Sequence, residues 1–185
     1  LNQHVASELI TMVDFAHSYQ GEELLVPIYA DEEGTPAQDV TLIENGVLRG
    51  FMHNRESAAE METHVTGNAR AAQPLDEPII RMRNTAILPG RDNYNEMIKG
   101  VEDGYLLLKT GSGQADTNGE FMFSVHLGYE IKNGVICKAI KDTTLSGNAF
   151  DTLKSVDAVY SDMFWTNAGY CGKKQWLLVS MGGPA

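Results

Sequence analysis

The stretch GSGQADTNGEFMFSVHLGYEIKNGVICKAIKDTTLSGN, residues 111–148, decides the fold of this chain. It contains two Asn-Gly pairs, Asn118-Gly119 and Asn133-Gly134, and each pair is flanked by runs in which apolar and polar residues alternate. A two-residue type I′ turn needs positive φ at both central positions, which Asn-Gly supplies readily. The stretch therefore predicts a three-stranded antiparallel meander whose central strand includes Phe121 to Ile131.

The same alternation predicts the register of the second hairpin. Around Asn133-Gly134 the expected cross-strand pairs are Ile131–Ile136, Tyr129–Lys138 and Leu127–Ile140 on one face, and Glu130–Cys137, Gly128–Ala139 and His126–Lys141 on the other. Successive side chains of a strand point to opposite faces, so we expect the mostly apolar face to be buried. The polar face is expected to meet water or to line a cavity.

Similar signals predict further strands on both sides of the meander. A third Asn-Gly pair, Asn45-Gly46, predicts a hairpin with Ile43 opposite Leu48 and Val40 opposite Phe51. From their β-branched and alternating residues, strands are also expected at Ser7–Phe15, Ile79–Leu88 and Gln175–Met181. The residues before the last strand, Asn167–Lys174, are expected to form a tight turn.

Three short helices are expected, each after a residue that caps helix N-termini well. The expected caps are Asn54 for a helix to about Thr63, Asp92 or Asn93 for a helix that Gly104 ends, and Asn148 for a third helix. The segment Gly67–Pro78 is expected to be irregular, as a functional loop or, more commonly, a plain surface connection. We therefore predict an α+β fold, mostly antiparallel hairpins and meander, in a single domain spanning residues 1–185.

The composition limits the classes of function. With 43% hydrophobic and 21% charged residues, the 185-residue chain is typical of a globular protein, and we expect no membrane segment. Its formal net charge of −11 would repel a phosphate backbone, so nucleic acid is not expected as a ligand. Two cysteines do not suggest a secreted disulfide framework, which favours a cytoplasmic protein. Because residue 1 is Leu, we expect a piece of something longer.

Few residues point to chemistry by themselves, because the sequence has no nucleophile elbow, P-loop or dinucleotide fingerprint. Cys171 follows Tyr170 and precedes Gly172, so it is either a zinc ligand facing a cleft or, as is common for a lone cysteine, a small buried hydrophobe. Cys137, in mid-strand, is expected to be a buried hydrophobe. The histidines show no helical i, i+4 pair, and His126 is expected to be solvated.

The segment GSGQAD, residues 111–116, is a candidate for ligand contact. Its glycines allow another backbone to come close, either a neighbouring strand or a ligand. It precedes a strand and not a helix, which argues against a phosphate cradle. The carboxylates Asp116, Glu120 and Glu130 are candidate acid or base groups that no sequence pattern pairs.

Taken in order, seven blocks of this sequence resemble the C-terminal part of the TldD/PmbA family of zinc-dependent peptidases. They are ASELITMVD, DEEGTP, TLIENGVLRGFM, RMRNTAILPG, GSGQADTNGEFMFS, YEIKNGVICKAIKDTTLSGN and CGKKQ. The resemblance runs from about Ala6 to Pro184 and indicates the metal-binding, TldD-like type. In that type a His-Glu-x-x-x-His helix supplies two zinc ligands and a general base, and a Cys in a Cys-Gly-Lys segment supplies the third ligand.

The resemblance makes Cys171 the candidate zinc ligand. Three protein ligands leave a position open for the water that attacks an amide. The chain departs from the family pattern in two ways: it has no His-Glu-x-x-x-His, and CGKKQ lacks the Gly that usually precedes the Gln. We therefore expect that this chain alone does not retain zinc or cleave peptides.

Two functions from different classes follow from the resemblance. The first is the C-terminal domain of a zinc peptidase acting on short or unfolded peptides. In it, Gly111, Gly113, Gln114 and Asp116 would form part of the substrate cleft and add a peptide to a strand edge. The second is a non-catalytic, PmbA-type partner subunit or a stand-alone interaction domain. The resemblance implies a homodimer or a heterodimer with a PmbA-type paralogue.

Overall fold

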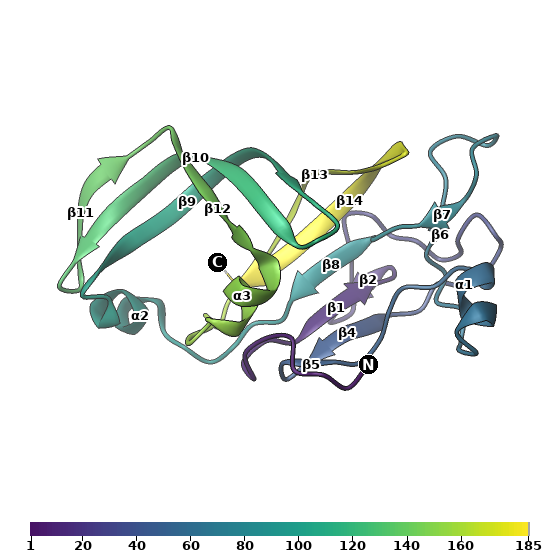
Figure 1. Ribbon diagram of the computed structural model, residues 1–185, viewed down its shortest axis with the longest axis horizontal. Helices are drawn as coiled ribbons and strands as arrows, with labels where there is room; N and C mark the ends of the chain where they lie inside the picture. Colours follow the sequence, from purple (N-terminus) through teal and green to yellow (C-terminus); the bar gives the residue numbers. More distant parts are fainter. Residues whose placement is uncertain (185) are drawn as a thin grey trace.

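The computed structural model describes residues 1–184, except for the side chains of Asn167 and Ala168. The chain folds into two main β-sheets that lie side by side (Figure 1). The six-stranded sheet has the order β13-β14-β8-β1-β4-β5, and the four-stranded sheet contains β9 to β12. The predicted α+β class, mostly antiparallel with three short helices, is confirmed. Ala185, the last residue of the predicted domain, lies outside the described residues.

The six-stranded sheet combines strands from both ends of the chain. Its members are β1 (Met12–Phe15), β4 (Val40–Glu44), β5 (Val47–Leu48), β8 (Asn84–Ile87), β13 (Met163–Lys173) and β14 (Gln175–Pro184). Two small hairpins accompany it, β2 (Ser18–Tyr19) with β3 (Glu22–Glu23) and β6 (Ala69–Arg70) with β7 (Ile79–Ile80). The contact of β14 with β8 is parallel, and it joins the C-terminal hairpin to the N-terminal strands.

The meander is built as predicted around one long central strand, with an additional partner. Its strands are β9 (Asp103–Ala115), β10 (Glu120–Lys132), β11 (Val135–Ile140) and β12 (Thr143–Asn148). β9 covers one side of β10, while β11 and β12 share the other side. Among the described strands β9 therefore pairs only with β10, and its outer edge is free.

The turns and register of the meander differ in part from the prediction. Asn133 and Gly134 both have positive φ, as a type I′ turn requires, but in the first turn only Gly119 does. Ile131 lies opposite Ile136 as expected. A bulge then shifts the pairing by one residue, so that Tyr129 faces Ala139 and not Lys138. The sequence pattern alone does not reveal such a bulge, because an exposed strand such as β11 tolerates either register.

Several predicted boundaries also need correction. The strand expected at Ser7–Phe15 is formed only by β1, because Ile10 donates its N–H to Ser7 O in a preceding turn. The strand expected at Ile79–Leu88 is split into β7 and β8. Ile43 lies opposite Leu48 as predicted, but β5 ends there, so Val40 and Phe51 do not pair.

The three helices begin where the sequence predicts. They are α1 (Arg55–Glu60), α2 (Tyr94–Gly100) and α3 (Ala149–Lys154), capped by Asn54, Asn93 and Asn148. Gly104 does not end α2 as expected, because the C-cap is Val101 and Gly104 already belongs to β9. No helix in the described part of the chain is long and apolar enough to cross a membrane.

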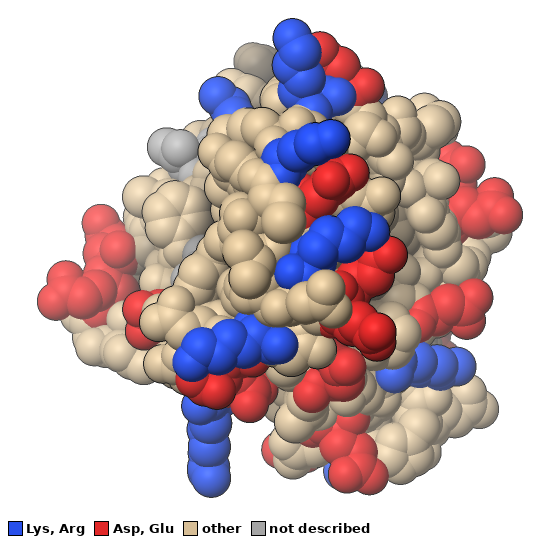
Figure 2. All heavy atoms as spheres, turned by 90° about the vertical axis from the view of Figure 1, so that its left-hand side faces the viewer, with Lys and Arg blue, Asp and Glu red and all other residues tan. Residues whose placement is uncertain are grey.

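The surface at the meander end of the molecule mixes both signs of charge. Figure 2 shows lysine and arginine side chains interleaved with aspartate and glutamate on this face. Among the described residues, ion pairs here include Lys132 with Asp103 at 2.6 Å and Lys99 with Glu96 at 2.8 Å. This face therefore offers no continuous basic patch for a polyanion.

A buried ion pair lies at the centre of the six-stranded sheet. Asp14 on β1 and Arg83 just before β8 both have fully buried side chains, and Arg83 Nε donates to Asp14 Oδ2 at 2.9 Å. The same carboxylate accepts hydrogen bonds from the Arg83 N–H, Asn68 Nδ2 and Thr85 Oγ1, each at 2.8 Å. Arg83 also donates to Gln38 O at 2.7 Å. Each charge is thus satisfied, which is the condition for an ion pair to persist in a core.

We predict that Asp14→Asn lowers the free energy of unfolding by about 3–5 kcal/mol, because it leaves the Arg83 charge buried without its counter-ion. Urea denaturation measures this loss. The matched control is Asp103→Asn, which removes an exposed partner of Lys132 and should cost no more than about 1 kcal/mol. Equal losses in the two variants would contradict the structural role of the buried pair.

Candidate functional site

Cys171, the predicted zinc ligand, lies in a long hairpin made by β13 and β14. The tight turn expected over Asn167–Lys174 is wrong, because strand β13 continues through Lys173. The chain reverses at Lys174, which has a φ of 58°, and Lys173 lies opposite Gln175. Cys171 is therefore placed by strand pairing, two residues before the end of its strand.

The thiol of Cys171 is half-buried and is not in a disulfide. Cys171 lies directly opposite Leu177, a buried residue, so both side chains lie on the face of the hairpin that contacts the core. The other face carries Tyr170 and Trp176, which are 65% and 73% exposed. Cys137, expected to be a buried hydrophobe, is in fact exposed, because the whole of β11 is at the surface.

The described residues do not form a metal site around Cys171. No group of three or more His, Cys, Asp or Glu side chains among them could hold a metal ion. A structural or catalytic zinc site needs three or four such ligands. The described residues around Cys171 therefore do not fit zinc by themselves.

A buried arginine donates hydrogen bonds to the backbone of the hairpin around its turn. Arg81, 1% exposed, donates from Nη1 to Lys173 O at 2.9 Å and to Gln175 O at 3.1 Å, and from Nη2 to Cys171 O. Its three acceptors belong to the two ends of the turn. Sequence reasoning missed this residue, because Arg81 and Arg83 alternate with apolar residues and a charged position is normally assigned to the solvent face.

A second buried arginine lies nearby on β6. Arg70 Nη1 donates to Met82 O at 2.8 Å and to Leu178 O at 3.2 Å. Burial is the main cause that lowers the pKa of Arg70; Glu32 opposes this effect, and the charge of Arg81 adds to it. Arg70 and Arg81 thus both bind backbone carbonyls of the hairpin, whereas the Arg83 guanidinium pairs with Asp14.

The segment expected to be irregular, Gly67–Pro78, in fact includes the short strand β6, and only residues 71–78 form the connection to β7. This connection lies against the tip of the hairpin (Figure 1). Gln175 joins the two: its Oε1 accepts from Ala72 N and its Nε2 donates to Glu77 O, both at 2.8 Å. Lys174 Nζ lies 3.4 Å from Glu77 Oε2. The CGKKQ segment is therefore held by Arg81 and by the connection that precedes β7.

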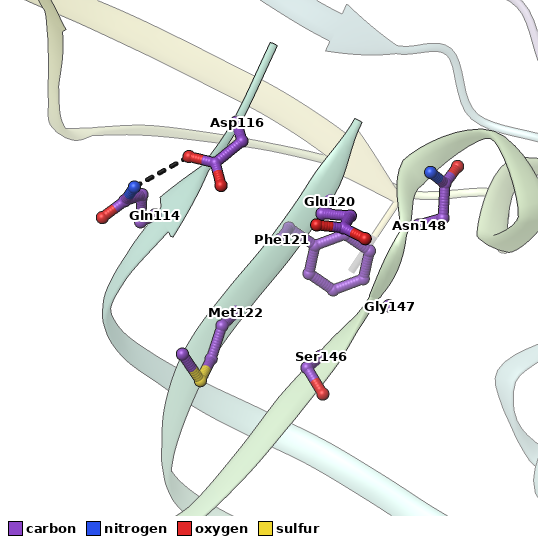
Figure 3. A pocket seen from close by; sticks show the side chains of 8 residues that line it. All are labelled: Gln114, Asp116, Glu120, Phe121, Met122, Ser146, Gly147 and Asn148. Carbon is purple, nitrogen blue, oxygen red and sulfur yellow. Dashed lines mark hydrogen bonds between the residues drawn. The ribbon is translucent and has the colours of Figure 1, made fainter. Parts of the chain in front are cut away.

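The predicted substrate segment lies elsewhere, at the end of strand β9, whose outer edge is free, and in the turn that follows it. Gln114 and Asp116 line an open hollow of about 550 Å³ together with Glu120, and Gln114 Nε2 donates to Asp116 Oδ1 at 2.7 Å (Figure 3). Gly111 and Gly113 lie just before them on the same strand. Cys171 is not among the residues that line this hollow.

The two glycines are required by close contact with β10. A Cβ at Gly113 would lie 2.0 Å from Cδ1 of Phe123, and one at Gly111 would lie 2.2 Å from Nε2 of His126. The neighbour that the sequence analysis expected near these glycines is thus the adjoining strand. His126 itself is exposed, as expected.

The remaining candidates do not converge on Cys171. Asp116 and Glu120 share the hollow, whereas Glu130 lies further along β10. His53 is buried and its Nδ1 lies 3.1 Å from Ser57 Oγ at the start of α1. The chain thus carries two separate candidate regions, the Cys171 hairpin on one sheet and the Gln114–Asp116 hollow on the other.

Comparison with known proteins places this geometry in a class. The family model described as the PmbA/TldA metallopeptidase C-terminal domain matches residues 1–184. A zinc metalloprotease TldD homologue from Saccharolobus solfataricus is 35% identical over 184 residues, covering 99% of this chain and 41% of its own length. A metalloprotease from Methanocaldococcus jannaschii is 40% identical over 174 residues, covering 94% of this chain and 38% of its own length.

Solved structures give the same fold. TldE from Thermococcus kodakarensis superposes with a TM-score of 0.81 at 24% identity, over 100% of this chain and 39% of that one. A putative modulator of a DNA gyrase from Thermotoga maritima gives 0.78 at 26% identity, with the same two coverages. The fold and the sequence matches define a metallopeptidase-family C-terminal domain.

The chain belongs to the PmbA/TldD family, as the resemblance predicted. It spans about two fifths of the length of these relatives. Relatives include proteins named as TldD homologues, such as the metalloprotease TldD homologue of Buchnera aphidicola, 36% identical over 188 residues that cover 100% of this chain and 38% of its own length.

The departure at CGKKQ has a structural consequence that can be measured. Lys174, directly before Gln175, has the left-handed φ of 58°, which a residue with a Cβ adopts at a cost of roughly 1–2 kcal/mol. We predict that Lys174→Gly raises the free energy of unfolding by about 1 kcal/mol. Urea denaturation measures the change.

Lys174→Ala is the control for this variant. It removes the ammonium group near Glu77 but keeps the Cβ, so its stability should stay within about 0.5 kcal/mol of the parent chain. If the glycine and alanine variants are equally stable, strain at this turn is not the cause.

Proposed function

We propose that this chain is the C-terminal domain of a cytoplasmic zinc-dependent peptidase that cleaves short or unfolded peptides. One observation carries the proposal: Cys171, free and half-buried, lies on a hairpin whose backbone a buried arginine holds in place. In a metallopeptidase-family domain, such a fixed thiol suits a metal ligand better than a packing residue, because ligands must be held in a defined geometry.

In this proposal Cys171 supplies one of three zinc ligands. The others, and the general base, come from a His-Glu-x-x-x-His segment that this sequence does not contain. Zinc, when bound, would activate a water molecule for attack on an amide. The role of the present chain is to hold the thiol and to form part of the substrate cleft.

The substrate would bind along the free edge of β9. Gly111, Gly113, Gln114 and Asp116 lie on or next to this strand, which pairs only with β10 among the described strands. An extended peptide can add to such an edge through main-chain hydrogen bonds, which do not depend on its sequence. The carboxylates of Asp116 and Glu120 favour a peptide that presents an ammonium group to the hollow.

The alternative function is a non-catalytic PmbA-type partner subunit or a stand-alone interaction domain. The missing His-Glu-x-x-x-His segment favours it. The CGKKQ segment favours the peptidase. A homodimer, or a heterodimer with a PmbA-type paralogue, is part of both proposals.

We predict that Cys171→Ser removes bound zinc from the protein in which this chain is joined to a His-Glu-x-x-x-His segment. Metal analysis after gel filtration should give a zinc content at least about tenfold below that of the parent. Cys137→Ser, at the exposed cysteine, should bind zinc as the parent does. Unchanged zinc in the Cys171 variant would overturn the ligand assignment and favour the partner-subunit function.

We also predict that Asp116→Asn weakens binding of a fluorescently labelled basic peptide by about fivefold, the equivalent of roughly 1 kcal/mol for an exposed charge pair. Fluorescence anisotropy measures the affinity, and added salt should reduce the difference. Asp103→Asn, at the other end of β9, is the matched control and should bind as the parent does. Equal weakening by both variants would assign the effect to net charge and not to the hollow.

A further inference from the structure

Arg81 is a buried arginine whose side chain binds backbone carbonyls. Its side chain is 1% exposed, and no ion pair links it to a carboxylate among the described residues. Its hydrogen bonds go to three main-chain carbonyls, those of Cys171, Lys173 and Gln175. Its Nε is buried and has no hydrogen-bond partner.

Such an arrangement is a poor way to fill a core. Burying a cation without a counter-ion is expensive, and a methionine or leucine of similar volume would pack there at less cost. What an apolar side chain cannot do is bind three carbonyls at once. The planar guanidinium group has several donors in a fixed geometry, so it can hold both ends of one turn.

The three carbonyls define the position of the candidate ligand. Cys171 O is on β13, Gln175 O is on β14, and Lys173 O lies at the turn between them. Fixing these atoms fixes the backbone from which the Cys171 side chain projects. Gln175 adds a second restraint through its hydrogen bonds to Ala72 and Glu77.

We propose that Arg81 is the positioning residue of the Cys171 thiol: by holding three carbonyls of the hairpin it fixes where the sulfur lies. The importance of that position for metal binding rests on the proposed function. The positioning itself can be tested without metal, and the chain provides a matched control.

Arg70 is that control. It is 5% exposed, has a buried Nε without a partner, and donates to the carbonyls of Met82 and Leu178. It therefore shares the burial and the carbonyl bonding of Arg81, but its acceptors lie outside residues 171–175. A purely structural contribution should appear equally in variants of both arginines.

The test measures alkylation of Cys171 by iodoacetamide at constant pH, in a Cys137→Ser background that leaves one thiol. We expect Arg81→Met to raise the rate on the order of tenfold, as the loss of charge-assisted hydrogen bonds loosens the hairpin. Arg70→Met should stay within about twofold of the parent, although both variants are less stable to urea. If both variants raise the rate equally, Arg81 is not a positioning residue.

Arg81→Lys provides a second variant should Arg81→Met fail to fold. Lysine retains the charge but not the planar fork, so it should also raise the alkylation rate well above that of Arg70→Met. A rate equal to that of the parent would overturn the proposal, because charge alone would then suffice.

A metal arm separates this inference from the proposed function. In the protein that includes the His-Glu-x-x-x-His segment, the thiolate-to-cobalt charge-transfer absorption reports Co²⁺ binding through Cys171. Arg81→Met should weaken Co²⁺ binding about 10–100-fold, and Arg70→Met should not. If Cys171→Ser retains its zinc while Arg81→Met still raises the alkylation rate of Cys171, the ligand role fails and the positioning role stands.

Discussion

Asp14 and Arg83 form an ion pair with no exposed side-chain surface, and much of the six-stranded sheet is arranged to satisfy it. The carboxylate accepts hydrogen bonds from Thr85 on β8 and from Asn68, and the guanidinium donates to the carbonyls of Gln38 and Gly67. Neither charge could remain buried without these partners. The pair therefore constrains four chain segments that are far apart in sequence.

This constraint extends to the candidate ligand. Arg83 lies directly before β8, and Arg81, two residues earlier, donates hydrogen bonds to the hairpin that carries Cys171. The parallel contact between β8 and β14 fixes the same two elements relative to each other, with Ser180 opposite Asn84. The Cys171 backbone is thus connected to the centre of the domain through Arg81 and Arg83, which lie between β7 and β8.

The two sheets of the domain differ in burial and in the candidate residues that they carry. The six-stranded sheet contains buried polar groups and packs against two apolar clusters, and it carries Cys171 on β13. The four-stranded sheet is largely exposed, with a free edge on β9 and an acidic hollow beside it. Cys171 and the free edge of β9 therefore lie on different sheets of the domain.

The sequence by itself determined the local structure and the family. Asn-Gly pairs, alternating residues and helix caps act over a few neighbouring residues, so they predicted the meander, the Asn45-Gly46 hairpin and the starts of all three helices. The ordered blocks from Ala6 to Pro184 identified the family, and CGKKQ indicated Cys171 as the candidate zinc ligand. These signals depend on short-range geometry, which one chain segment carries alone.

Only the tertiary structure decided how these pieces are held. The bulge after Ile131 depends on a strand pairing that an exposed β11 leaves undetermined. The inward direction of Arg81 and Arg83 depends on carbonyl and carboxylate partners up to 94 residues away in the chain. Periodicity records which residues share a face but not which face is buried. The arginine that holds the candidate ligand is therefore visible only once the distant strands are in place.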